Sequence, residues 1–305
     1  MPVKKTAAKP KKGVLDPILD AGRQAYEFLR VSYKPYFIFN LKLMLFMFAA
    51  LAVIGIVFLV FAFTLFGSVI SALLSGSATL ATAASSISFI HFVLLAIIGL
   101  ILFLLMQFTS YAVLAAMFRG TADGMNKKPF PPIVSTVRAY FWLVMGYALF
   151  VLLLMVVLFG LPFLVLLIPN IGFLLLFPLL LVSLIVYIII HFLIQFTFWE
   201  LVLGGKRLID SIRVSIALVR SNLVGVLVFD IALFIIGLIV AGFFWAISNI
   251  LQIVVLPLSI FLPIAGLVLY VILYMVVTII QSILIYMVEY PFNLVYWKWL
   301  RGDSK

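Results

Sequence analysis

Basic residues along the chain fall into four clusters that are separated by long apolar stretches. Nine Lys and Arg residues lie between Lys4 and Lys42, and the three later clusters hold the rest of the 20. The stretches without a Lys or Arg are residues 43–118, 139–205 and 221–297. A membrane-spanning helix needs about 20 apolar residues, so each stretch can hold two helices and a turn. The pattern therefore predicts three helical hairpins, with six spanning helices in all.

The six helices are predicted at residues 43–69, 89–118, 139–161, 173–200, 223–251 and 265–290. Loops rich in Lys and Arg stay on the cytoplasmic side of a membrane. With six crossings, every basic cluster lies on that side and only uncharged turns lie on the other. We therefore expect a multi-pass protein of the cell membrane whose N- and C-termini are both cytoplasmic.

The composition supports an all-α polytopic membrane protein. Hydrophobic residues make up 67% of the 305, charged residues make up 10%, and cysteine is absent. The mean hydropathy of +1.39 lies far above that of water-soluble domains, which could not bury so much apolar surface. Soluble enzymes, disulfide scaffolds and disordered regulators are thereby excluded. The net charge of +11 predicts contact with anionic lipid at the cytoplasmic face, and it does not require nucleic acid as a partner.

Amphipathic segments precede two of the hairpins. In residues 207–222, one face carries Asp210, Arg213, Ala217 and Arg220, and the other carries Leu208, Ile209, Ile212, Ile216 and Val219. This spacing predicts an interfacial helix on the inner leaflet. Residues 16–30 repeat the pattern, so a second interfacial helix is expected there. Prolines at 129, 131 and 132 break the middle copy and leave only residues 133–138 as a helical lead.

The domain organisation is expected to be one membrane domain behind a basic tail. Residues 1–13 are predicted to be disordered and residues 14–302 to form a single six-helix domain. The motif Gln-Phe-Thr at residues 107–109 recurs at 195–197, and Gln281 follows at a similar spacing. These matches indicate three repeats, at residues 14–118, 119–205 and 206–301, although chance similarity in so biased a composition remains the alternative.

Groups that make or break bonds are sparse in the sequence. His91 and His191 are the two histidines, and neither has another histidine, a cysteine or paired carboxylates at metal-ligand spacing. The phosphate-binding and nucleophile-elbow motifs are also missing. We therefore expect no enzymatic activity, no catalytic or metal-binding residue and no cofactor.

Polar residues inside the predicted helices form the candidate intramembrane site, which consists of Asp230, His191, Gln195, Gln107 and Gln281. A charged Asp within a spanning helix costs roughly 2.5–3.5 kcal/mol on insertion scales, so some partner should offset it. One hypothesis is a hydrogen bond inside the bundle, to His191 or to a glutamine. The other is a proton or substrate site. Glu200 and Glu289, which close the fourth and sixth helices, are expected to pair with Lys206, Arg207 or Lys298.

The candidate contacts with inner-leaflet lipid are Lys206, Arg207, Arg213 and Arg220. They favour a non-enzymatic module that binds or organises lipid or partner membrane proteins. The alternative is a secondary transporter or channel-like protein that uses Asp230 and His191 in the bundle core. A core cavity that reaches Asp230 would discriminate between the two.

One junction resembles known membrane proteins. It reads ELVLGG at residues 200–205, IDSIRVS at 209–215 and LVRSN at 218–222, and the last helix ends in LVYWKWLR at 294–301. Over residues 195–301 the chain resembles the YciC-like proteins and the membrane domain of some glycerophosphoryl diester phosphodiesterases. In those enzymes the chemistry belongs to a separate soluble domain. The resemblance therefore implies the six-helix fold rather than an activity.

Overall fold

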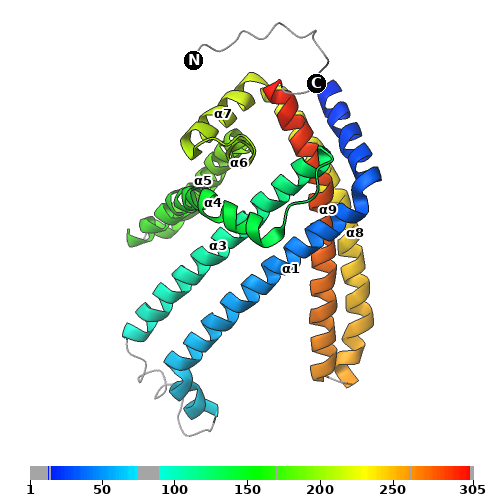
Figure 1. Ribbon diagram of the computed structural model, residues 1–305. Helices are drawn as coiled ribbons and strands as arrows, with labels where there is room; N and C mark the ends of the chain where they lie inside the picture. The colour runs from blue at the N-terminus through cyan, green and yellow to red at the C-terminus, as the bar shows by residue number, and fades with distance from the viewer. Residues whose placement is uncertain (1–12, 14, 75–88, 169–170, 262, 303–305) are drawn as a thin grey trace. The chain divides into compact units, whose positions relative to one another are not determined.

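The computed structural model describes residues 13, 15–74, 89–168, 171–261 and 263–302, and this part of the chain is helical (Figure 1). The elements are α1 (Asp16–Leu74), α3 (Phe89–Met125), α4 (Ile133–Met155), η1 (Val156–Gly160), η2 (Leu161–Leu167), α5 (Gly172–Ile194), α6 (Thr197–Val202), α7 (Leu208–Ser221), α8 (Leu223–Phe261) and α9 (Pro263–Arg301). Six segments are long and apolar enough to cross a membrane. The predicted all-α class and the six spans are confirmed.

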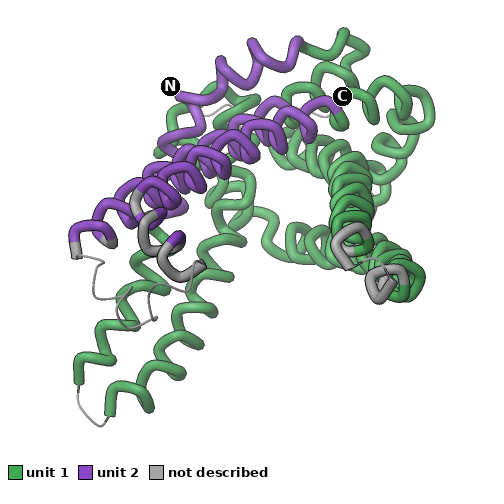
Figure 2. The backbone as a smooth tube through the Cα atoms, turned by 90° about the horizontal axis from the view of Figure 1, so that it is seen from below, with its two compact units in different colours: residues 1–41, 117–131, 153–305 green, residues 42–116, 132–152 purple. Residues whose placement is uncertain are grey.

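The chain forms two compact units, shown in different colours in Figure 2. Unit 1 comprises Met1–Leu41, Met117–Pro131 and Leu153–Lys305, and unit 2 comprises Lys42–Ala116 and Pro132–Leu152. The boundary between the units at residues 41–42 falls inside α1, and the boundary at residues 116–117 falls inside α3. Secondary structure along the chain therefore does not reveal where one packed unit ends.

Several predicted helix starts match the structure, whereas α3, α8 and α9 run past the predicted ends at residues 118, 251 and 290. Helices α3 and α8 start at the expected residues, α4 starts after the three prolines, and α7 is a separate helix as predicted. Residues 16–30 are helical as predicted, but they form the first part of the 59-residue helix α1 and not a helix of their own. Helix α1 has no glycine between Gly22 and Gly55, and Pro35 is the only helix-breaking residue in that stretch. A proline inside a helix commonly bends it without ending it.

The core of unit 1 lies near the helix ends that carry the basic clusters. Phe118 at the end of α3 stacks on Trp199 of α6, with the ring centroids 3.8 Å apart, and Tyr290 of α9 packs edge-on against Phe118. By contrast, the most apolar window of each spanning segment is at most 11% buried within the chain. Most side chains in the apolar middle of the spans are therefore not buried within the chain, and packing in the described part of unit 1 concentrates at one end.

The loop between α3 and α4 packs against α1 through Phe130. Its ring stacks on Phe39 of α1 at 4.9 Å and lies 6.0 Å from the ring of Tyr36. The Tyr36 hydroxyl shares a 2.7 Å hydrogen bond with Thr121 of α3. Gly120 permits this close packing, because a Cβ atom at that position would overlap the Phe39 ring.

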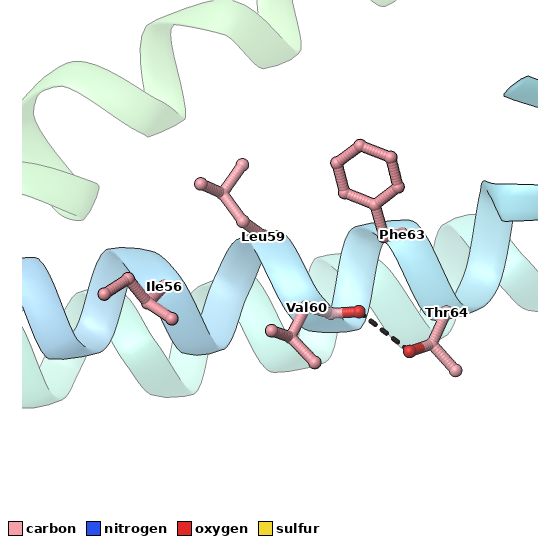
Figure 3. Close-up of a pocket in the computed structure, with 5 residues that line it drawn as sticks. All are labelled: Ile56, Leu59, Val60, Phe63 and Thr64. Atoms are coloured by element: carbon pink, nitrogen blue, oxygen red, sulfur yellow. Dashed lines mark hydrogen bonds between the residues drawn. The ribbon is translucent and has the colours of Figure 1, made fainter.

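Unit 2 packs through aromatic pairs between α3 and α4, such as Tyr111 with Tyr147 at 5.5 Å. Its α1 segment carries a hollow of about 420 Å³ (Figure 3), lined by Ile56, Leu59, Val60, Phe63 and Thr64. The Thr64 hydroxyl donates to the carbonyl of Val60 at 2.8 Å. Because this one polar side chain bonds to its own helix, the hollow presents an apolar surface suited to lipid.

Candidate functional site

The fourth spanning segment is interrupted at Gln195 and Phe196, between α5 and α6. Ser215 of α7 bonds to both sides of the interruption: its Oγ accepts from the Phe196 N–H at 3.1 Å and donates to the Leu193 carbonyl at 3.0 Å. Backbone groups that a helix break leaves open need such partners when they are buried. One serine therefore satisfies the break and fixes α7 against the spanning segment.

Asp230 of α8 lies next to this break. The Gln195 side-chain nitrogen, in the amide orientation that satisfies both groups, donates to the two Asp230 carboxylate oxygens at 3.1 and 3.2 Å. Both residues are half-buried. This contact agrees with the bond to a glutamine that the sequence suggests for Asp230. It offsets part of the cost of placing a carboxylate in a spanning helix.

The other candidates do not join this contact. His191 is exposed and stacks on Tyr187, one turn before it in α5, at 5.8 Å. Gln281 is half-buried in α9, and Gln107 is half-buried in α3 within unit 2. Among the candidates in the described part of unit 1, only Gln195 contacts Asp230. The repeated glutamines also differ in local structure, since Gln195 sits in a helix break and the other two sit within continuous helices.

A fully buried carboxylate, Glu200 of α6, lies at the centre of a polar cluster in unit 1. Its Oε2 atom lies 2.8 Å from the Lys206 ammonium, the ion pair that the sequence predicts. Its Oε1 atom accepts from the Trp297 indole N–H at 3.0 Å and lies 3.7 Å from Nε of Arg301. The Arg301 guanidinium also lies over the Trp297 ring, 4.9 Å from its centre. The cluster thus joins α6, the α6–α7 loop and the end of α9.

Sequence reasoning did not identify Trp297 and Arg301 as partners of Glu200. They are separated by four positions, so they share a face of α9, but 97 residues separate Trp297 from Glu200. Glu289 also differs from expectation. It forms no ion pair with a described residue and instead lines a hollow of about 30 Å³ with Leu233, Gly237 and other residues of α8 and α9. Among the described residues, no three His, Cys, Asp or Glu side chains group closely enough to hold a metal ion.

The charged face of α7 is exposed as predicted, and the residues that α7 buries against the protein lie mostly outside its predicted apolar face. Arg213 and Arg220 project outward on the same side as Asp210. The buried positions are Ser211, Ser215 and Val219, spaced by one helical turn. On the predicted apolar face, Val219 is buried, while the isoleucines are half-buried or, at Ile209, 63% exposed. Small serines allow α7 to approach α5 and α6 closely, so the isoleucines remain at the edge of the contact.

The four predicted lipid-contacting residues thus divide into two groups. Arg207, Arg213 and Arg220 are exposed, whereas Lys206 is half-buried and neutralises Glu200. Within the described part of the chain, the three arginines form no ion pair. Arg213 and Arg220 place two positive charges on one side of α7, which Ser215 and Lys206 hold in place, and Arg207 adds a third charge immediately before the helix.

Comparison with known proteins places these features within a family. No curated protein and no solved structure matches the chain. One family model matches residues 132–293, a range that begins before α4 and includes Gln195, Glu200, α7 and Asp230. The matched model covers more than half of the chain, and its description assigns no activity. The chain therefore belongs to the family defined by the domain of unknown function DUF7847.

Proposed function

We propose that this chain is a non-enzymatic membrane protein that binds anionic phospholipid of the cytoplasmic leaflet through α7. The observation that carries the proposal is the exposure of Arg207, Arg213 and Arg220 without an ion-pair partner among the described residues. Each Lys or Arg near an anionic membrane surface contributes about 1 kcal/mol of attraction. The arginine guanidinium also binds phosphate with two parallel hydrogen bonds.

The support for a defined site, rather than general surface charge, is the anchoring of α7. Ser215 ties the helix to the break after α5, and Lys206 ties the preceding loop to buried Glu200. Arg213 and Arg220 are two turns apart on one face, roughly 10 Å along the helix axis. A fixed array of cations loses less conformational freedom on binding than a flexible basic tail does.

The test measures binding of a fluorescent phosphatidylglycerol to the purified chain in neutral detergent micelles, by fluorescence anisotropy. The variant Arg213→Gln/Arg220→Gln removes two of the three arginines. Its matched control, Arg23→Gln/Arg30→Gln, removes two exposed charges from α1, where Arg23 pairs with Glu27 at 3.1 Å. Both variants have the same net charge.

We expect the α7 variant to bind about 2 kcal/mol more weakly, which is roughly a 30-fold rise in Kd, and the control to stay within about threefold of the original chain. Added salt should weaken binding by the original chain, because exposed charges are screened. Equal losses in the two variants would show that net charge, and not α7, determines binding. Equal binding of phosphatidylcholine would show that anionic headgroups are not selected.

The proposal also requires α7 to face the cytoplasm, which a labelling experiment can test. The natural chain has no cysteine, so single substitutions report cleanly. A cysteine at Ser77 should react with an impermeant maleimide added to intact cells, whereas cysteines at Ser135 and Ser304 should react only after lysis. The reverse pattern would place α7 on the outer face and contradict the proposal.

A secondary transporter is the second candidate, and the break between α5 and α6 is the observation that favours it. Transporters often bind substrates and ions at interrupted spanning helices. Here Asp230 and Gln195 lie at such a break. Ser215 already occupies the open backbone groups of Leu193 and Phe196, which favours a structural role for the break. Proton uptake into liposomes that depends on an added solute and disappears in Asp230→Asn would favour transport instead.

A further inference from the structure

The turn between α4 and α5 differs from the cytoplasmic end of the protein in having no polar side chain in its described part. No charged residue occurs between Arg138 and Glu200. We define the apolar tip as residues 161–168 and 171–177, which comprise η2, Ile168 after it, Ile171 and the start of α5. Its largest side chains are strongly exposed: Leu167 is 79% exposed, Phe173 is 84% and Phe177 is 75%.

The tip has a compact but irregular backbone. The preceding segment η1 is π-helical, and η2 is a seven-residue 3₁₀-helix, longer than such helices usually are. The Ile168 N–H bonds to the Val165 carbonyl at 2.9 Å, and the Gly172 N–H bonds to the Ile168 carbonyl at 3.0 Å. Gly172 packs directly on the Val165 carbonyl, since a Cβ atom there would overlap the carbonyl oxygen. The tip is therefore a tightly folded structure.

Side chains and backbone restrict the depth of the tip from opposite directions. Exposed leucine and phenylalanine side chains disfavour water. Irregular backbone disfavours the hydrocarbon centre, where unpaired peptide groups find no partner. The interface between headgroups and acyl chains suits both, because it hydrates the backbone and accepts apolar side chains.

The length of α5 agrees with this depth. Its 23 residues span roughly 34 Å at about 1.5 Å per residue, slightly more than the roughly 30 Å hydrocarbon core. Gly172 would then lie just beyond the far edge of that core. The exposed side chains of the tip are also continuous with the exposed apolar residues further along α5, such as Leu181 and Val182.

We propose that the apolar tip is embedded in the lipid interface of the leaflet opposite α7, with Leu167, Phe173 and Phe177 inserted among the acyl chains. This surface is separate from the arginine site and binds lipid without selecting charge. The turn would thus anchor the far end of the fourth spanning segment, while Ser215 and Glu200 fix its near end.

The experiment places the environment-sensitive fluorophore NBD on single cysteines of the full chain in phosphatidylcholine nanodiscs. The test positions are Leu167→Cys and Phe173→Cys. Asp20→Cys, on the exposed charged face of α1, provides the water reference, and Val182→Cys, near the middle of α5, provides the deep-lipid reference. Quenching is measured with aqueous iodide and with lipids that carry a nitroxide near the headgroup or deep in the acyl chain.

We expect the tip probes to be quenched most strongly by the shallow nitroxide and at least fivefold less by iodide than the Asp20 probe. Three results would overturn the proposal. Iodide quenching equal to that at Asp20 would place the tip in water. Strongest quenching by the deep nitroxide, as expected at Val182, would place it in the hydrocarbon core. Quenching by none of these reagents would show that protein covers the tip.

Discussion

Replacing Glu200 by alanine should be among the most destabilising single changes in unit 1. The carboxylate is fully buried and has three partners. Its removal leaves the buried Trp297 indole N–H unpaired, at a cost of about 1–3 kcal/mol. Loss of the Lys206 ion pair adds about 1 kcal/mol, a modest value because the Lys206 side chain is 32% exposed. The lost methylene contacts add about 1–2 kcal/mol, for a combined effect of about 3–6 kcal/mol.

The assay is reversible unfolding in mixed micelles at increasing SDS fraction, followed by tryptophan fluorescence. Glu200→Gln is the matched variant, because its amide oxygen can still accept from the Trp297 indole while the charge is gone. We expect Glu200→Gln to lower the free energy of unfolding by about 1–2 kcal/mol, clearly less than Glu200→Ala.

Two outcomes would refute this reasoning. If Glu200→Ala left the unfolding free energy unchanged, the cluster would not contribute to the stability of the packed end. If Glu200→Gln cost as much as Glu200→Ala, the loss would come from the charge, and the indole hydrogen bond would contribute little. Changes in expression alone would decide neither point, so both variants are compared at equal purified concentration.

Three further substitutions test the packing and the break. Gly120→Ala should lower the free energy of unfolding by about 1–3 kcal/mol, because the added methyl group overlaps the Phe39 ring of α1. Gly55→Ala is the control: its position is in open space, so the change should be neutral or stabilising in the same SDS titration. Ser215→Ala should lower the free energy of unfolding by about 1–3 kcal/mol, because two backbone groups lose their partner. Ser211→Ala should lower it less, because the buried Ser211 hydroxyl has no partner among the described residues. Equal effects would contradict the bridging role of Ser215. Asp230→Asn should leave the free energy of unfolding unchanged or raise it by up to about 2 kcal/mol, since a neutral amide costs less free energy in a spanning helix than a charged carboxylate does. A large loss of unfolding free energy would show that the charge is structurally required.

The sequence by itself determined the features that depend on local composition. The number of spans follows from the length of apolar stretches compared with the bilayer thickness, which is a property of each segment alone. The start of α4 follows from three prolines, and α7 follows from the helical spacing of its charges. The Glu200–Lys206 pair was also predictable, because the two residues are close in the chain and opposite in charge.

Only the tertiary structure decided which sides of these helices meet. In a membrane protein, apolar residues face lipid and protein alike, so hydropathy does not distinguish the two environments. The α7 contact therefore uses Ser211 and Ser215, which pack closely, instead of the neighbouring isoleucines, and Ser215 also bonds to backbone. The break at Gln195 and the approach of Trp297 to Glu200 likewise depend on partners 19 to 97 residues away. Such contacts arise from the packing of whole helices, which no local pattern of hydrophobic and polar residues records.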